Sequence, residues 1–342
     1  MTSAQLARRT GMSEKHISQL VNARATLTMD VALQLERALD IPAQLWNSLE
    51  FNYRSELRRE EERSSLKAFA DWMRAFPVRE MAKRGYLPAD LGQDVVSRVE
   101  GLLGFFGVTS PTAWDSEWQH VTARFRKSPS FDPDRHALTA WLRQGEILAG
   151  GVRCEPYDEQ RFRSALQRIR RLTTAPPDEF QGKAVDLCRS AGVALTLVPS
   201  LPGVAICGAA RWLAADRAAI HLSLRHKSDD QLWFSFFHEA CHVLEHASSA
   251  IYIDDAHGAQ DGDAAERRAN EFARDTLIPP DRYNAFVAGS GPMTLARIVD
   301  FADQVGVSPG VVVGRLQFDG RMPHTHGNAL KRRFRWTFEE AP

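Results

Sequence analysis

One stretch of this chain carries two histidines and a glutamate at a spacing that suits metal chemistry. The segment FHEACHVLEH, residues 237–246, contains the pattern His-Glu-x-x-His, with His238 and His242 four residues apart. On a helix this spacing puts both imidazoles on one face, where they can bind the same metal ion. Glu239 is rotated by about 100° from the pair. It therefore suits the base that takes a proton from the water that a zinc ion activates.

A motif this short also arises by chance, and the alternative is a surface helix with an unrelated histidine pair. The surrounding residues argue against that alternative, because they make the helix apolar over much of its circumference. Polar side chains buried in such a helix cost roughly several kcal/mol unless they gain partners. A metal ion supplies a partner for them. The apolar neighbours are Phe234, Phe236, Phe237, Val243 and Leu244.

A third ligand is needed, and three side chains compete for the role. His246 continues the four-residue spacing, but it would lie about 12 Å along the helix from His238, too far for two bonds of about 2.1 Å to one ion. The next predicted helix, residues 264–276, carries Glu266 and Glu271. Glu266 lies on a stripe of small residues that permits close approach to the histidine helix, whereas Glu271 points roughly 140° away. We expect Glu266 to be the third ligand, with Glu271 as the alternative.

These segments resemble the ImmA/IrrE family of zinc metallopeptidases. The similarity rests on FHEACHVLEH at 237–246, followed by ERRANEFARDTLIPP at 266–280. The upstream segments GAARWL at 208–213 and IHLSL at 220–224 are also similar. The resemblance covers roughly residues 193–280.

The resemblance implies a bacterial or phage zincin-like endopeptidase that cuts a transcriptional repressor or a related regulatory protein. By this similarity the metal ligands are His238, His242 and Glu266, and the cofactor is Zn²⁺. Glu239 is implied as the catalytic base.

The peptidase domain is expected over residues 176–288, with an α+β fold in which a small antiparallel sheet lies beside the histidine helix. If residues 220–224 form an edge strand, an extended substrate can pair along it. Three strands are predicted, near residues 193–199, 204–213 and 219–224. Three side chains are candidates to stabilise the oxyanion: Arg211, Arg225 and His226.

Residues 3–22 have the pattern of two helices joined by a tight turn. Gly11 lies at the turn, Ser13 can cap the second helix, and Ile17 can anchor it. Helices are also predicted over residues 29–39 and 42–53. Together, residues 1–54 resemble the helix-turn-helix domain of the XRE/Cro family, as found in HigA-type antitoxins.

In that fold the second helix enters the major groove of DNA with its N-terminal turns. The resemblance implies that Lys15, His16 and Gln19 face base edges, with Ser13 near a phosphate. Residues 1–53 carry five basic and five acidic side chains, so the electrostatic contribution to DNA binding is weak. The alternative is a small helical packing or dimerisation module.

The helix that precedes this motif in the family has no counterpart here, because the sequence begins inside what corresponds to the second helix. The missing helix would cover the apolar sides of Leu6, Ile17 and Leu33. Apolar burial stabilises by about 25 cal/mol per Å², and a domain this small has little stability to lose. We therefore expect the 342 residues to bind DNA weakly.

The rest of the chain is expected to be helical. Residues 55–175 form a middle region, beginning with a solvated charge run, in which aromatic residues recur as core anchors do. Residues 289–342 form a C-terminal extension, which we expect to pack as a helical hairpin beneath the peptidase domain. Its basic and aromatic segment at 331–336 is expected to be an exposed helix end.

Composition sets few limits on partners. Lys+Arg and Asp+Glu are both 43, so the net charge does not point to a polyanionic partner. The four cysteines form no Cys-x-x-Cys pair, as suits a reducing cytoplasm. A polar beginning and the lack of an 18-residue apolar run argue against secretion and membrane association.

The sequence thus predicts an α+β, mostly α-helical cytoplasmic regulator that joins a DNA-binding domain to a zinc peptidase acting on a protein substrate. A homodimer is a further partner that this interpretation allows. The alternative is a DNA-binding repressor or antitoxin whose peptidase-like domain is structural or sensory. Glu239 favours the enzyme, because a structural metal site has no need of a base.

Overall fold

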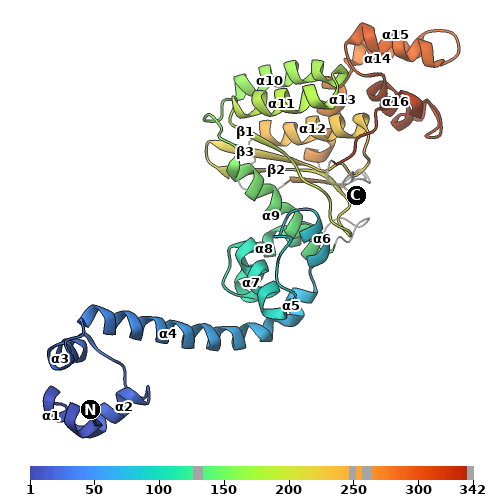
Figure 1. The fold of residues 1–342 in the computed structure, drawn as a ribbon. Coiled ribbons are helices and arrows are strands. Elements are labelled where there is room, and N and C mark those ends of the chain that lie inside the picture. The colour runs from blue at the N-terminus through green and yellow to red at the C-terminus, as the bar shows by residue number, and fades with distance from the viewer. Residues whose placement is uncertain (126–133, 246–251, 256–263, 337–342) are drawn as a thin grey trace. The chain divides into compact units, whose positions relative to one another are not determined.

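The computed structural model describes residues 1–125, 134–245, 252–255 and 264–336. The chain divides into two compact units. The N-terminal unit comprises Met1–Asp71 and Asp94–Glu100, and the C-terminal unit comprises Trp72–Gln93 and Gly101–Pro342. Figure 1 shows helices throughout and one small sheet in the C-terminal unit, which confirms the mostly α-helical α+β class.

The N-terminal unit begins with the predicted helix pair, α1 (Ser3–Thr10) and α2 (Glu14–Val21). Gly11 ends α1 with a φ of 76°, a left-handed conformation that glycine adopts without strain. The Ser13 hydroxyl accepts the N–H of the third residue of α2 at 3.1 Å, so the predicted cap is present. Ile17 is buried against the neighbouring helices.

Helices α3 (Met29–Leu39) and α4 (Ala43–Leu66) follow in this unit. The predicted end of α4 at residue 53 is wrong, because the helix continues through the charge run. Ion pairs at i,i+3 and i,i+4 stabilise an exposed helix by about 0.2–0.5 kcal/mol each. Three such pairs lie here: Glu50–Arg54 at 2.9 Å, Glu56–Arg59 at 2.7 Å and Arg58–Glu61 at 2.7 Å.

The four-stranded sheet of the C-terminal unit has the strand order β1-β3-β2-β4. Strand β2 (Ile206–Ala214) is antiparallel to both β3 (Arg217–Leu222) and β4 (Tyr252–Asp255). Strand β1 (Val193–Leu197), however, is parallel to β3. The expectation of a wholly antiparallel sheet is therefore wrong, because the β2–β3 hairpin inserts β3 between β1 and β2.

Strand β3 is a central strand, so the hypothesis that residues 220–224 offer an edge to substrate is also wrong. Five of its six residues are buried in succession, as is typical of a strand paired and covered on both sides. The edges of the sheet are β1 and β4.

Helices cover both faces of the sheet (Figure 1). Successive residues of β3 face opposite ways: Leu222 belongs to the main apolar core, whereas His221 lies against the backbone of Gly145 in α9. On the core side lie α10 (Glu159–Arg171), α11 (Pro177–Arg189) and α12 (Asp229–Leu244), and on the other lies α9 (Arg135–Gly151).

The remaining helices precede or follow this layered region. Ile298 and Val312, from α15 and α16, belong to the same core as α12, so the expected C-terminal hairpin is confirmed. The other bounds are α5 (Ala70–Arg74), α6 (Val78–Lys83), α7 (Val95–Phe106), α8 (Pro111–Phe125), α13 (Ala264–Leu277), α14 (Pro280–Ala288), α15 (Leu295–Val305) and α16 (Pro309–Phe318). Across the part of the chain that the structure describes, no helix combines the length and apolarity needed to cross a membrane.

Residues 331–336 are not the exposed helix end that we expected. They form an extended segment in which Phe334 is buried. The Lys331 ammonium pairs with Asp230 at 2.6 Å, and both side chains are at most 10% exposed. Because breaking a buried pair costs about 3–5 kcal/mol, this segment fixes the N-terminal turn of α12.

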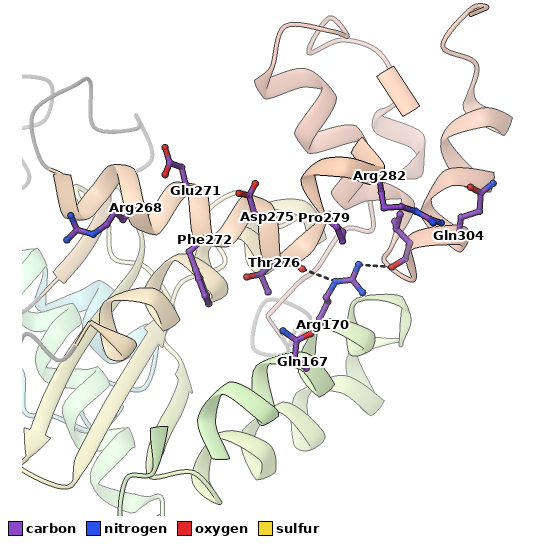
Figure 2. A pocket seen from close by; sticks show the side chains of 11 residues that line it. Gln167, Arg170, Arg268, Glu271, Phe272, Asp275, Thr276, Pro279, Arg282 and Gln304 are labelled. Atoms are coloured by element: carbon purple, nitrogen blue, oxygen red, sulfur yellow. Dashed lines mark hydrogen bonds between the residues drawn. The ribbon is translucent and has the colours of Figure 1, made fainter. Parts of the chain in front are cut away.

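Arg170 connects the ends of three helices (Figure 2). From the last turn of α10, its guanidinium donates to the carbonyls of Thr276 at 2.8 Å and Leu277 at 3.1 Å. It also donates to the carbonyl of Val305 at 2.6 Å. The C-terminal carbonyls of α13 and α15, which lack partners within their helices, are thereby satisfied by one cation.

His221 is an imidazole held inside the sheet. It is fully buried, and its Nδ1 lies 2.7 Å from the hydroxyl of Thr196. A Cβ at position 145 would lie 2.6 Å from the ring, so only glycine fits there. Burial, and to a lesser extent the charge of Arg211, lowers the pKa of His221 to about 3.

This depressed pKa predicts acid sensitivity of the C-terminal unit. The unfolded chain takes up a proton at His221 near pH 6.5, whereas the folded chain resists it to about pH 3. The stabilising contribution is therefore complete above pH 6.5 and is lost as the pH falls toward 3. Between pH 7 and pH 5 the loss amounts to about 2 kcal/mol of unfolding free energy.

Urea unfolding of wild type and of His221→Asn at the two pH values measures this contribution. The variant should lose less unfolding free energy than wild type between pH 7 and pH 5. Equal losses in the two proteins would show that His221 does not carry the effect.

Candidate metal centre

The histidine helix α12 is buried along almost its whole length. Asp229 and Asp230 in its first turn complement the positive end of the helix dipole. Helix α13 packs against α12, and Ala269 and Ala273, which follow Glu266 at i+3 and i+7, are both 0% exposed. The predicted small-residue stripe is thus present at the contact, and it lets the two helix axes approach closely.

At this contact three side chains converge. The Nε2 atoms of His238 and His242 lie 3.1 Å apart. The carboxylate oxygens of Glu266 lie 3.1 Å from His238 Nε2 and 3.3 Å from His242 Nε2. A tetrahedral zinc ion with bonds of about 2.0–2.1 Å has ligand atoms about 3.3 Å apart. The two separations to Glu266 involve different carboxylate oxygens, and all three separations are close to those between ligand atoms in such a tetrahedron. The donor set suits zinc.

Burial and charge also suit a cation. The side chains of both histidines are at most 1% exposed, while that of Glu266 is 20% exposed, so the group opens to solvent on the side of α13. Burial by itself raises the pKa of Glu266, but the hydrogen bonds and charges of the two histidines outweigh it and lower the pKa to about 2. Glu266 is therefore a carboxylate throughout the neutral range.

Glu239 lies next to these ligands on α12 but faces the sheet. Its side chain is fully buried and packs against Gly208 of β2. A Cβ at position 208 would lie 2.7 Å from Glu239 Cγ, so glycine is required for β2 to approach so closely. The structure thus holds a carboxylate beside the histidine pair and away from bulk water.

Asn270 is a site residue that the sequence analysis missed. Its Oδ1 lies 3.0 Å from Nδ1 of His238. The residue is four positions after Glu266, which places both on the same face of α13. The four-residue spacing from Glu266 could have indicated Asn270, but only His, Cys, Asp and Glu side chains were considered as metal ligands.

The alternative ligand Glu271 lies elsewhere. It lines a surface pocket of about 880 Å³ together with Arg268 and Phe272, on another face of α13 (Figure 2). It is not part of the His238, His242 and Glu266 group. The other alternative, His246, lies outside the described residues.

The three oxyanion candidates separate by position. Arg211 forms an ion pair with Glu146 of α9, so it lies on the face of the sheet opposite Glu239 and cannot serve this role. Arg225 and His226 follow β3 and line a small cavity beside Ser235, one turn before Glu239 on α12. They remain candidates.

The predicted DNA-contacting residues occupy the first two turns of α2 and its cap. Lys15 and Ser13 are exposed, and His16 and Gln19 are half-buried. Gln19 follows Lys15 by four residues and His16 by three, so the three side chains share one side of the helix. Ile17, which anchors the helix, points the other way.

Two protein families match this chain. Residues 209–317, from β2 to α16, match the peptidase M78 family, described as the IrrE N-terminal-like domain. Residues 1–46, from α1 into α4, match the helix-turn-helix family. No curated protein matches the chain. The two matches confirm the architecture that the resemblance implied, a helix-turn-helix domain followed by an ImmA/IrrE-type domain.

The geometry predicts that the purified full-length chain holds one zinc ion. His238→Ala, His242→Ala or Glu266→Ala should each lose it, because two remaining ligands hold zinc poorly. The two helices should also separate more easily without the ion, so the melting temperature should fall. Elemental analysis by mass spectrometry and thermal unfolding measure both effects.

Glu271→Ala is the matched control, since it removes a neighbouring carboxylate that is outside the ligand group. It should keep full zinc content. Full zinc content in either histidine variant would refute the ligand assignment.

Proposed function

Because the chain joins a helix-turn-helix domain to an IrrE N-terminal-like peptidase domain, we propose that it is a zinc-dependent endopeptidase that acts in transcriptional regulation. Its substrate would be a protein, namely a transcriptional repressor or a related regulator. The observation that carries this proposal is the triangle of His238, His242 and Glu266 beside the buried carboxylate of Glu239.

Bound zinc would supply a Lewis acid that activates water and polarises the scissile carbonyl. Glu239 would accept the proton of the attacking water and pass it to the leaving amine, as a general base and then a general acid. Its burial against Gly208 supports this role, because the carboxylate is fixed in place and shielded from bulk solvent. Arg225 or His226 would stabilise the developing oxyanion.

An extended substrate segment would pair along β4. This strand is the edge of the sheet next to β2, and β2 carries the Gly208 backbone that packs on Glu239. Edge strands offer unpaired backbone groups for β-augmentation. The proposal therefore moves the substrate from the central strand β3 to the edge strand β4.

The N-terminal unit would bind DNA through α2. The exposed cap and Lys15 at its first turn support this role. A homodimer is supported by an apolar stripe on α4, where Leu45, Leu49 and Tyr53 follow at four-residue spacing and are 50%, 53% and 44% exposed. A cytoplasmic location agrees with four cysteines that are all unbridged.

The alternative function is a DNA-binding repressor or antitoxin with a structural or sensory metal domain. It does not explain why the buried side chain of Glu239 lies beside the ligands. The variant Glu239→Gln separates the two. It should retain zinc and the melting temperature of wild type, because Glu239 is outside the ligand triangle. It should lose roughly 10²–10⁴-fold in cleavage rate, because the amide cannot take the proton.

The assay follows cleavage of regulators encoded beside this gene by gel electrophoresis and mass spectrometry. His238→Ala is the control that loses both zinc and activity. Unchanged turnover in Glu239→Gln would show that Glu239 is not the base. If the wild type cleaves no neighbouring regulator, the sensory alternative is favoured.

DNA binding by the full chain should be weak and should decrease further as salt rises. Lys15→Ala or Gln19→Ala should relax sequence preference, since each removes a contact with a base edge. Lys67→Ala removes an exposed charge outside α2 and should leave the preference unchanged. Fluorescence anisotropy with operator fragments from the same locus measures both properties. Sequence-specific binding that survives both α2 substitutions would contradict the docking of α2.

A further inference from the structure

The second nitrogen of His238 has a partner that the proposed chemistry does not use. Nδ1 lies 3.0 Å from Oδ1 of Asn270, and His238 is 1% exposed. A carboxamide oxygen accepts hydrogen bonds and cannot donate them. Nδ1 is therefore the donor in this contact, which leaves Nε2 as the nitrogen that can offer a lone pair to an ion on the side of His242 and Glu266.

Helix α13 delivers this amide together with a ligand. Glu266 and Asn270 are one turn apart, so they reach the histidine helix from the same face. Between and beyond them, Ala269 and Ala273 are fully buried. The small side chains on this face permit a close approach of the two helices, and the half-buried Asn270 side chain thereby reaches His238.

We propose that Asn270 is a positioning residue of the metal centre, which fixes the tautomer and the ring orientation of His238 so that Nε2 faces the ion. The inference rests on the proposed function, because it concerns the same site. It also concerns the use of an amide, in place of a carboxylate, as the partner of His238. Among the described residues, the ligand group contains one carboxylate, Glu266, and Asn270 orients the imidazole without adding a second negative charge.

The rival explanation is that Asn270 only helps α13 pack against α12. The two explanations predict that different side chains can replace Asn270 without loss of zinc binding. Packing tolerates a near-isosteric apolar side chain, so Asn270→Leu should then be harmless. Orientation requires an acceptor, so Asn270→Asp should preserve zinc binding while Asn270→Leu should not.

The experiment measures the zinc dissociation constant of the full-length protein by competition with a chromophoric chelator. Asn270→Ala and Asn270→Leu should bind zinc about 10–100-fold more weakly than wild type, the usual effect of losing such an outer hydrogen bond. Asn270→Asp should bind at least as tightly as wild type. Glu271→Gln, the adjacent residue outside the ligand group, is the matched control and should change affinity less than about twofold.

A second readout is the visible spectrum of the protein loaded with Co²⁺, which reports the geometry of the ligands. It should change in Asn270→Leu and be restored in Asn270→Asp. Far-UV circular dichroism establishes that each variant is folded. If the Ala and Leu variants misfold, the Asp variant still decides, because zinc binding weaker than wild type in that variant overturns the proposal.

Wild-type zinc affinity in Asn270→Ala or Asn270→Leu also overturns it. Such a result, with cleavage by wild type intact, would leave the peptidase proposal standing. Conversely, a wild type that binds zinc but cleaves no regulator would contradict the peptidase proposal. The comparison of zinc affinity between wild type and the Asn270 variants would still be valid. The two failures are therefore distinguishable.

Discussion

The close contact of α12 with α13 is the constraint on which the metal centre depends. His238 and His242 come from one helix and Glu266 from the other, and atoms from all three lie within 4.8 Å of one another. Two helices meet this closely only where small side chains lie between them, here alanines that are completely buried. A larger residue at either alanine would separate the carboxylate from both imidazoles at once, because interiors packed at crystal density yield little.

Each of these helices is fixed again at its far end. Lys331, in the extended C-terminal segment, pairs with Asp230 in the first turn of α12. Arg170, on α10, binds the last carbonyls of α13. Both anchors are cations. Arg170 binds carbonyls that have no partner within their own helix, and Lys331 pairs with a carboxylate that would otherwise be buried alone. Segments distant in the sequence thereby hold the ligands in place, and catalysis gains from ligands carried on rigid elements.

Sequence patterns predicted the parts of this structure that local chemistry determines. A glycine in the left-handed region and a serine cap mark α1 and α2, and the spacing of His238, Glu239 and His242 marks the core of α12. Apart from the end of α4, which ion pairs within the helix extend, the misses are non-local. No local pattern records that β3 inserts beside β1, or that Phe334 is buried. Arg211 was a candidate because of its charge, but the alternation along β2 directs it to Glu146. Asn270 was missed because its role exists only through a bond to another helix.

Contacts within the protein place the metal ligands, so the fold does not depend on the metal to bring them together. Glu266 contacts both imidazoles, Asn270 holds His238, and the helices that carry them belong to a core shared with the sheet. Small zinc domains rely on the ion for folding because they lack such a core. Here apolar burial around α12 organises the site, so the free energy of zinc binding need not be spent on ordering the chain. It follows that substitutions at the ligands should affect metal content far more than overall structure, whereas substitutions at the alanine contact should affect both.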